Sequence, residues 1–146
     1  MKKQNYLYCF SPPVMIATFV IEMSLMVASF VRYKMTTALR LTMSILFFLA
    51  LFQLSEYFVC GGLGIQAASW SRIGYIAITM LPPLGLHLVA HIGDLKRRWP
   101  VAAAYVVAAC WIVLFGFSEL AFRGHLCAGN YVIFQLYAGI GGWYFV

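Results

Sequence analysis

A run of apolar residues from position 70 to position 92 is long enough to cross a membrane, and it contains Pro82 and Pro83 near its middle. About 20 apolar residues in a helix span the hydrocarbon of a bilayer. Proline has no N–H and its ring crowds the carbonyl four residues earlier, so the carbonyls of Ile78 and Thr79 lose their usual partners. In lipid, other helices, side chains or trapped water must satisfy them. The run therefore predicts a kinked central helix around which other spans pack.

The composition extends this interpretation to the whole chain. Of the 146 residues, 64% are apolar and 10% are charged, whereas a soluble domain is about half apolar. Five spans of about 20 residues would fill the chain and leave no segment for a soluble catalytic domain. The net charge of +6 does not indicate nucleic acid, because the basic residues lie at the ends of apolar runs. We therefore expect a membrane protein that is not an enzyme and binds no nucleic acid.

The apolar runs predict an all-α, polytopic transmembrane helix bundle that forms a single domain over residues 1–146. The expected spans are about 12–31, 41–59, 71–92, 100–122 and 128–146. The connections at 32–40 and 93–98 hold three basic residues each, and those at 60–72 and 123–129 hold one each. Because basic residues accumulate in cytoplasmic loops, we expect the N-terminus to lie outside.

Two motifs in this chain resemble a known membrane sensor. The string Trp70-x-Arg72-x-x-Tyr75, followed by Leu81-Pro82-Pro83, looks like the third helix of the seven-helix (7TM) module at the N-terminus of many bacterial histidine kinases and diguanylate cyclases. The string Leu54-Ser55-Glu56-Tyr57 is similar to the aromatic and acidic end of that family's second helix. The basic turns after the first and third spans agree with the family's topology, in which the N-terminus lies outside.

The resemblance covers about residues 12–146, as the first five helices of the module, and is concentrated in residues 40–92. The chain departs from the family in having five expected spans and no kinase or cyclase domain. The resemblance implies a sensory or binding module in a bacterial inner membrane that relays ligand binding through helix packing to a signalling output protein. The alternative is a small accessory subunit that packs against and stabilises a larger membrane complex.

The most unusual residue in the predicted spans is Glu22, a carboxylate near the middle of the first one. A charge at that depth is costly, so the carboxyl group should be protonated, paired or turned to a polar cavity. Counted along the helices, Glu22 and Pro82 lie at similar depths below the outer surface. We expect a polar pocket where Glu22, Gln53, Thr79 and the carbonyls freed by Pro82 and Pro83 meet a ligand or proton. The alternative is a neutral Glu22 that donates one interhelical hydrogen bond.

Two pairs of opposite charge lie near the expected outer surface. Glu119 and Arg123 are four residues apart, a spacing that places them on one face of a helix. Glu56 and Arg72 would face each other across the connection between the second and third spans. We expect both pairs to be structural ion pairs, and the alternative for Glu56 and Arg72 is an outer binding site for a polar ligand.

His87 and His91 are also four residues apart, so both imidazoles can point the same way. This spacing permits a shared metal, but a metal site needs further ligands, and no acid or thiol is expected at that depth. Haem ligation would normally take its two histidines from different helices. We therefore predict no cofactor and expect the histidines to pack or to form hydrogen bonds, with haem or metal ligation as the alternative.

The cysteines add one possible cross-link. The expected topology puts Cys60 and Cys127 outside, where an oxidising compartment would allow a disulfide between them. The alternatives are free thiols, a metal site that adds His125, or competition from Cys9. We expect Cys110, in the fourth span, to be a small apolar packing residue.

Overall fold

The computed structural model describes residues 12–60, 67–117, 122–128 and 131–136. Four helices in these ranges are long and apolar enough to cross a membrane, which confirms the predicted membrane-integral helical bundle. The helices are α1 (Pro12–Arg32), α2 (Thr37–Cys60), α3 (Ala67–Ile92) and α4 (Trp99–Phe117).

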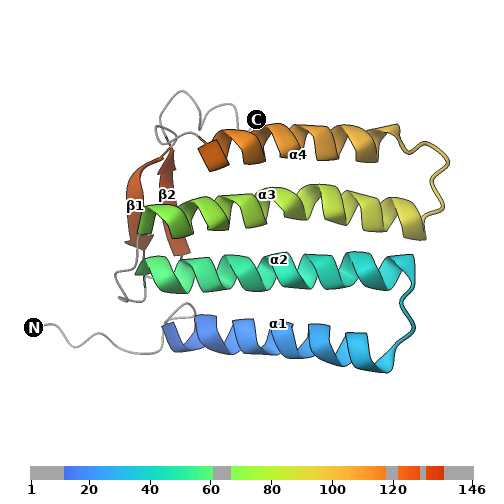
Figure 1. Ribbon diagram of the computed structural model, residues 1–146, viewed down its shortest axis with the longest axis horizontal. Helices are drawn as coiled ribbons and strands as arrows, with labels where there is room; N and C mark the ends of the chain where they lie inside the picture. The colour runs from blue at the N-terminus through green and yellow to red at the C-terminus, as the bar shows by residue number, and fades with distance from the viewer. Residues whose placement is uncertain (1–11, 61–66, 118–121, 129–130, 137–146) are drawn as a thin grey trace, which may run out of the picture.

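The four helices lie side by side in chain order, each antiparallel to the next (Figure 1). The main helix contacts join α1 to α2, α2 to α3 and α3 to α4. As a result, α2 separates α1 from α3, and the bundle is a single layer of helices. This order decides which residues can share a site.

Hydroxyl groups inside the helices bond to their own backbone. Five of them donate to the carbonyl oxygen four residues earlier, at 2.6–3.0 Å. The five donors are Thr18, Thr42, Ser44, Ser55 and Thr79. Because lipid cannot bond a hydroxyl, this local bond satisfies the hydroxyl donor within its own helix.

Small residues are buried on α2 and α3, the two helices with the most extensive mutual contact. Ala50 is 1% exposed, Ser55 and Ala77 are fully buried, and Ser71 is 3% exposed. Small side chains let two helix backbones approach closely, which is the usual way that helices associate in lipid. The pair α2 and α3 is therefore the centre of the bundle.

The two prolines do not end the central helix. α3 continues without interruption through Pro82 and Pro83 to Ile92. Pro83 is buried and Pro82 is exposed. Because α2 and α4 flank α3 on its two sides, packing supports the helix where its own hydrogen bonds are missing. The expected central position of this helix agrees with the packing of α3 between α2 and α4, and the expected kink stays a prediction.

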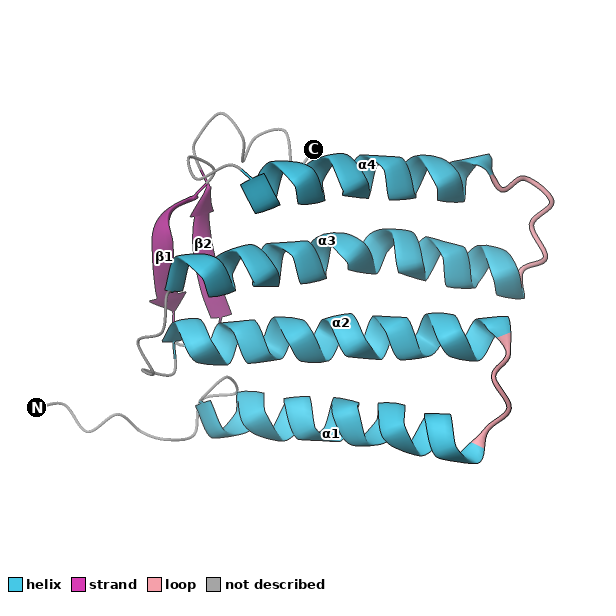
Figure 2. Cartoon of the chain, in the orientation of Figure 1, coloured by secondary structure: helices cyan, strands magenta, loops and turns pink. Residues whose placement is uncertain are grey.

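The start of the expected fifth span is not helical. Residues Phe122–Ala128 form strand β1 and Tyr131–Leu136 form strand β2, an antiparallel hairpin at the end of the bundle where α2 ends and α3 begins (Figure 2). The prediction of a helix from 128 onward is therefore wrong over 131–136, and residues 137–146 lie outside the described ranges. Val132, Ile133 and two aromatic residues favour a strand, and a hairpin with open edges belongs in water rather than in hydrocarbon.

Three helix boundaries also differ from the expected ones. α2 begins at Thr37 rather than near Leu41, so Arg40 lies in its first turn and not in a connection. The reason is a cap, because the Thr36 hydroxyl accepts a hydrogen bond from the Leu39 N–H at 3.2 Å. α3 begins four residues before the expected position 71, and α4 as described ends at Phe117 rather than near position 122.

Candidate functional site

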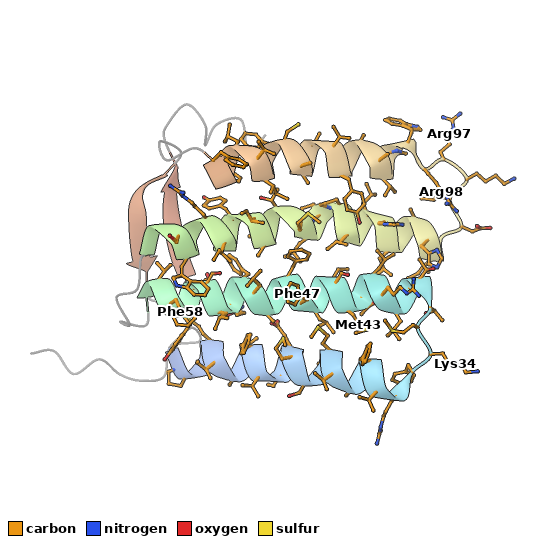
Figure 3. The ribbon with its side chains drawn as sticks, in the orientation of Figure 1. Lys34, Met43, Phe47, Phe58, Arg97 and Arg98 are labelled. Carbon is orange, nitrogen blue, oxygen red and sulfur yellow. The ribbon has the colours of Figure 1, made fainter. Side chains whose placement is uncertain are left out.

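The two ends of the bundle differ in charge. Six basic residues lie at the end that holds the α1–α2 and α3–α4 connections, which we call the charged end (Figure 3). They are Arg32, Lys34, Arg40, Lys96, Arg97 and Arg98. At the opposite end, which we call the aromatic end, Arg72 is the only basic side chain in the part of the chain whose side chains are described. By the positive-inside rule, this asymmetry favours a cytoplasmic charged end and an N-terminus outside.

The structure does not bring the five residues of the expected mid-membrane pocket together. Glu22 is on α1, whereas Thr79, Pro82 and Pro83 are on α3, and α2 lies between these helices (Figure 1). Glu22 and the prolines lie at similar depths below the outer surface of the membrane, but a similar depth does not determine which helices are neighbours. The prediction of one shared pocket is therefore wrong.

The individual residues of that prediction have separate surroundings. Thr79 is 5% exposed, and its hydroxyl donates to the Tyr75 carbonyl at 2.6 Å. Gln53 is half-buried on α2. Glu22 is half-buried on α1, and its Oε2 is buried without a hydrogen-bond partner among the described residues. The alternative in which Glu22 donates one interhelical hydrogen bond stays a prediction.

A cavity of about 460 Å³ lies at the charged end, where the start of α2, the end of α3 and the start of α4 meet. Its polar lining residues come from all three helices and from the α3–α4 loop, and its apolar wall comes from α3, the loop and α4. The lining residues are Thr37, His87, Ala90, His91, Asp94, Leu95, Arg98, Val101, Ala102 and Tyr105. Both histidines singled out in the sequence thus face one cavity, while its other members were not anticipated.

His87 and Tyr105 join α3 to α4 in the deeper part of this cavity. The Tyr105 hydroxyl lies 3.2 Å from His87 Nδ1, and the two rings meet edge to face at 89°. A hydrogen bond to Nδ1 fixes the orientation of an imidazole and selects its tautomer. His87 of α3 is therefore held in place against Tyr105 of α4.

Asp94 occupies an unusual backbone position at the end of α3. Its φ is 47°, the left-handed region in which glycine is the usual residue. The Leu95 N–H donates to the Ala90 carbonyl at 3.0 Å, which closes the helix end around Asp94. At Gly93, the residue before Asp94, an added Cβ would meet the Val89 carbonyl oxygen at 3.1 Å. A charged side chain therefore stands where the backbone would prefer glycine, at the rim of the cavity.

The cavity offers no metal site of the usual kind. Within the described ranges, no group of three or more His, Cys, Asp and Glu residues could hold a metal ion. His91 is exposed and His87 bonds to Tyr105, so the two histidines do not act as a matched pair. The expectation that they form hydrogen bonds is confirmed for His87.

Aromatic side chains pack closely at the aromatic end. Phe115 of α4 is fully buried between Tyr75 of α3, at a ring distance of 4.9 Å, and Trp111, at 5.6 Å. Phe58 of α2 stacks on Trp70 of α3 at 4.2 Å. Aromatic pairs at these distances add to the packing of a helix interface. This end fixes α2, α3 and α4 relative to one another.

The expected ion pair of Glu56 and Arg72 lies within this packed end. Glu56 on α2 is 3% exposed, and Arg72 on α3 is half-buried with its Nε lacking a hydrogen-bond partner among the described residues. The two residues occupy the same end of neighbouring helices. Their pairing stays a prediction, as does the alternative of an outer binding site.

The second ion pair cannot form in the expected way. Arg123 lies in strand β1, so it does not share a helix face with Glu119, which is outside the described residues. The cross-link between Cys60 and Cys127 also concerns side chains outside the described set, together with His125 and Cys9. Cys110 is exposed on α4, so its expected packing role stays a prediction.

Comparison of the chain with protein-family models, with curated proteins and with solved structures finds no match.

Proposed function

We propose that the protein is a membrane-embedded binding or sensory module that takes a ligand in the charged-end cavity and relays binding to a partner protein. The observation that carries this proposal is the convergence of two histidines, a tyrosine, an arginine and an aspartate on one cavity of about 460 Å³. A cavity of this size with an apolar wall and a few polar groups is typical of small-molecule sites. The module would have no catalytic domain of its own and would act on a signalling output protein.

The contrast between the two ends suggests how the relay works. The cavity separates α2, α3 and α4 at the charged end, while aromatic rings hold these helices together at the aromatic end. A ligand that contacts all three helices would change their spacing at the charged end, because each helix could tilt slightly about its contacts at the aromatic end. The α1–α2 and α3–α4 connections, which carry the basic residues of the charged end, would transmit this displacement to a cytoplasmic partner.

The resemblance of the α3 motif to the 7TM sensor module supports the same function. Trp70 and Tyr75 of that motif belong to the aromatic contacts that fix α3 against α2 and α4. The resemblance also favours the bacterial inner membrane as the location. The motif would then be the fixed part of the module and the cavity its responsive part.

An accessory subunit is the second candidate, and the exposed surface of α1 favours it. Val31 is 76% exposed, Phe30 61% and Ile21 59%, and a shallow hollow runs along α1 beside Phe19 and Met23. A helix of another membrane protein would fit such a surface as well as lipid does. In this case the binding partner is a polypeptide, and the charged-end cavity has no ligand.

Mass spectrometry of the intact protein after mild detergent extraction separates the two functions. Ala102 lines the cavity and its neighbour Ala103 does not, although both are exposed. A binding module should carry a small molecule that is lost in Ala102→Trp, which fills the cavity, and retained in Ala103→Trp. A protein that carries no small molecule, and instead a fixed set of polypeptides unaffected by Ala102→Trp, would be an accessory subunit.

A further inference from the structure

We infer that the charged-end cavity binds a phosphate ester that carries a primary ammonium group. The structure points to this chemistry through one positive and one negative side chain at the same rim, neither of which is neutralised by the other. This inference rests on the proposed function, because it names the ligand class of the same cavity. Such a group is available from the bilayer, as the headgroup of phosphatidylethanolamine, or from water, as free phosphoethanolamine.

The two rim charges select a ligand with both signs. Asp94 and Arg98 are exposed and line the cavity, and neither has an ion-pair partner in the part of the chain that the structure describes. A purely anionic ligand would be repelled by Asp94, and a purely cationic one by Arg98. A ligand that carries a phosphate and an ammonium group satisfies both side chains at once.

Arg98 and His91 are the groups suited to the phosphate. A guanidinium donates two parallel hydrogen bonds to phosphate oxygens, and an imidazole adds a third donor. Lys96, Arg97 and Arg40 lie at the same end but do not line the cavity, so the phosphate donors within it are Arg98 and His91. Basic pockets between helices at the cytoplasmic face favour phosphate headgroups for this reason.

Asp94 is the group suited to the ammonium. Its backbone lies at φ 47°, where glycine would be unstrained. The strained position therefore carries a carboxylate that contributes nothing to closing the helix end, because the Leu95-to-Ala90 hydrogen bond is made by the backbone. A primary ammonium has three N–H donors for such a carboxylate, whereas a trimethylated one has none.

The order of the groups along the helices matches the order of groups in a lipid. Asp94 lies in the loop beyond α3, His91 and Arg98 lie at the helix ends, and Tyr105 lies about 10 Å deeper, seven residues into α4. In a phosphatidylethanolamine the ammonium is outermost, followed by the phosphate, the ester carbonyls and the acyl chains. The Tyr105 hydroxyl is suited to the ester carbonyls. The apolar wall suits the first carbons of the chains, and its residues are Ala90, Leu95, Val101 and Ala102.

Lipid retention in nanodiscs tests the inference. The whole protein is reconstituted with equal amounts of phosphatidylethanolamine, phosphatidylglycerol and phosphatidylcholine, and the lipids that stay bound are counted by native mass spectrometry. We expect phosphatidylethanolamine to be retained about tenfold over the other two, because only it offers both charges and N–H donors. Arg98→Ala should remove all retention, and the matched Arg97→Ala, which does not line the cavity, should leave it unchanged.

A second variant separates the two charges. Asp94→Asn should abolish the preference for phosphatidylethanolamine over phosphatidylglycerol while a phospholipid is still retained. Equal retention of phosphatidylglycerol and phosphatidylethanolamine by the unmodified protein would overturn the role of the ammonium, and equal loss in Arg97→Ala and Arg98→Ala would overturn the site. These two results would refute this inference without refuting the proposed function, provided that Ala102→Trp still removes some bound molecule.

Free phosphoethanolamine distinguishes the source of the ligand. If millimolar phosphoethanolamine, but not inorganic phosphate, displaces the retained lipid, both sources share the site and the chemistry is supported. If phosphoethanolamine raises the unfolding temperature of lipid-free protein and no phospholipid is retained, the chemistry is supported with a water-soluble source. If none of these compounds binds and Ala102→Trp removes nothing, this inference and the proposed function fail together.

Discussion

The two ends of the helix layer differ in residue type and in how closely the helices pack. At the aromatic end, Phe115 is fully buried between Tyr75 and Trp111. At the charged end, the same three helices leave a cavity of about 460 Å³ between His87, Tyr105 and the α3–α4 loop. α2, α3 and α4 are thus joined by aromatic contacts at one end and leave a cavity between them at the other.

The difference follows from what each end must satisfy. Aromatic rings and small side chains gain stability by close contact, so the aromatic end has little space left. Histidine, arginine and aspartate need water or a polar ligand, so the charged end cannot close over them without cost. Substitutions at the aromatic end should therefore mainly lower stability, whereas substitutions at the charged end should mainly change ligand retention.

The largest effect on stability is expected from Phe115→Ala at the aromatic end. Removing a fully buried ring should lower the free energy of unfolding by about 3 kcal/mol or more, because the cavity left behind loses contacts with α3. The measurement is unfolding of the protein in mixed micelles, followed by tryptophan fluorescence. The matched control is Phe117→Ala, whose ring is 86% exposed and whose loss should cost little. Equal effects of the two substitutions would remove the basis for a packed aromatic end.

A smaller effect is expected from Tyr105→Phe at the charged end. This change removes the 3.2 Å contact between the hydroxyl and His87 Nδ1 and keeps the ring. The free energy of unfolding should fall by about 1 kcal/mol, the net value of one hydrogen bond. Tyr33→Phe, in the exposed α1–α2 connection, is the control for a general hydroxyl effect. A loss as large as that of Phe115→Ala would mean that the charged end is as tightly packed as the other.

A third substitution should raise stability slightly. Asp94→Gly relieves the positive φ of 47°, and the gain should be about 0.5 kcal/mol after allowing for the greater freedom of glycine in the unfolded chain. Asp94→Ala keeps the strain and should not stabilise. In the same preparation, Asp94→Gly should weaken ligand retention. A variant that is both more stable and fully able to retain its ligand would show that the carboxylate has no role at the rim.

The smallest effect is expected from Glu22→Gln on α1. Glu22 lies outside both ends and is separated from α3 by α2, and an amide is nearly as costly in lipid as a protonated carboxyl group. Unfolding should change by less than about 0.5 kcal/mol, and the molecule bound by the protein should be unaffected. Intact mass spectrometry of the variant checks this, and loss of the bound molecule would return Glu22 to the site.

The spans were predictable because lipid imposes a simple requirement on sequence. A segment that crosses hydrocarbon must be apolar over about 20 residues, and the spans expected at 12–31 and 100–122 correspond to α1 and α4. A hairpin was also predictable from the sequence, because the dipeptide Gly129-Asn130 between Ala128 and Tyr131 is typical of two-residue hairpin connections. The apolar length of residues 128–146 predicts a helix and the dipeptide predicts a hairpin, and the structure has a strand over 131–136.

The candidate site was only partly predictable. The spacing of His87 and His91 indicates a shared helix face, but nothing in the sequence pairs His87 with Tyr105, which is 18 residues away. Asp94 and Arg98 looked like ordinary loop charges because the left-handed backbone at Asp94 is visible only in the structure. The mid-membrane pocket was wrong because residue depth follows from sequence, whereas the lateral order of helices follows from packing.

Chemical labelling of single cysteines tests the contrast between the two ends most directly. In a background without native cysteines, Ala102→Cys places a thiol in the cavity, and Ala77→Cys places one at a fully buried position in the half of α3 that lies toward the aromatic end. A charged, membrane-impermeant thiol reagent should label position 102 in inside-out vesicles, leave it unlabelled in right-side-out vesicles, and fail to label position 77 in either. Labelling of both positions at similar rates, or of position 102 from the outer side only, would contradict a water-accessible cytoplasmic cavity beside a packed aromatic end.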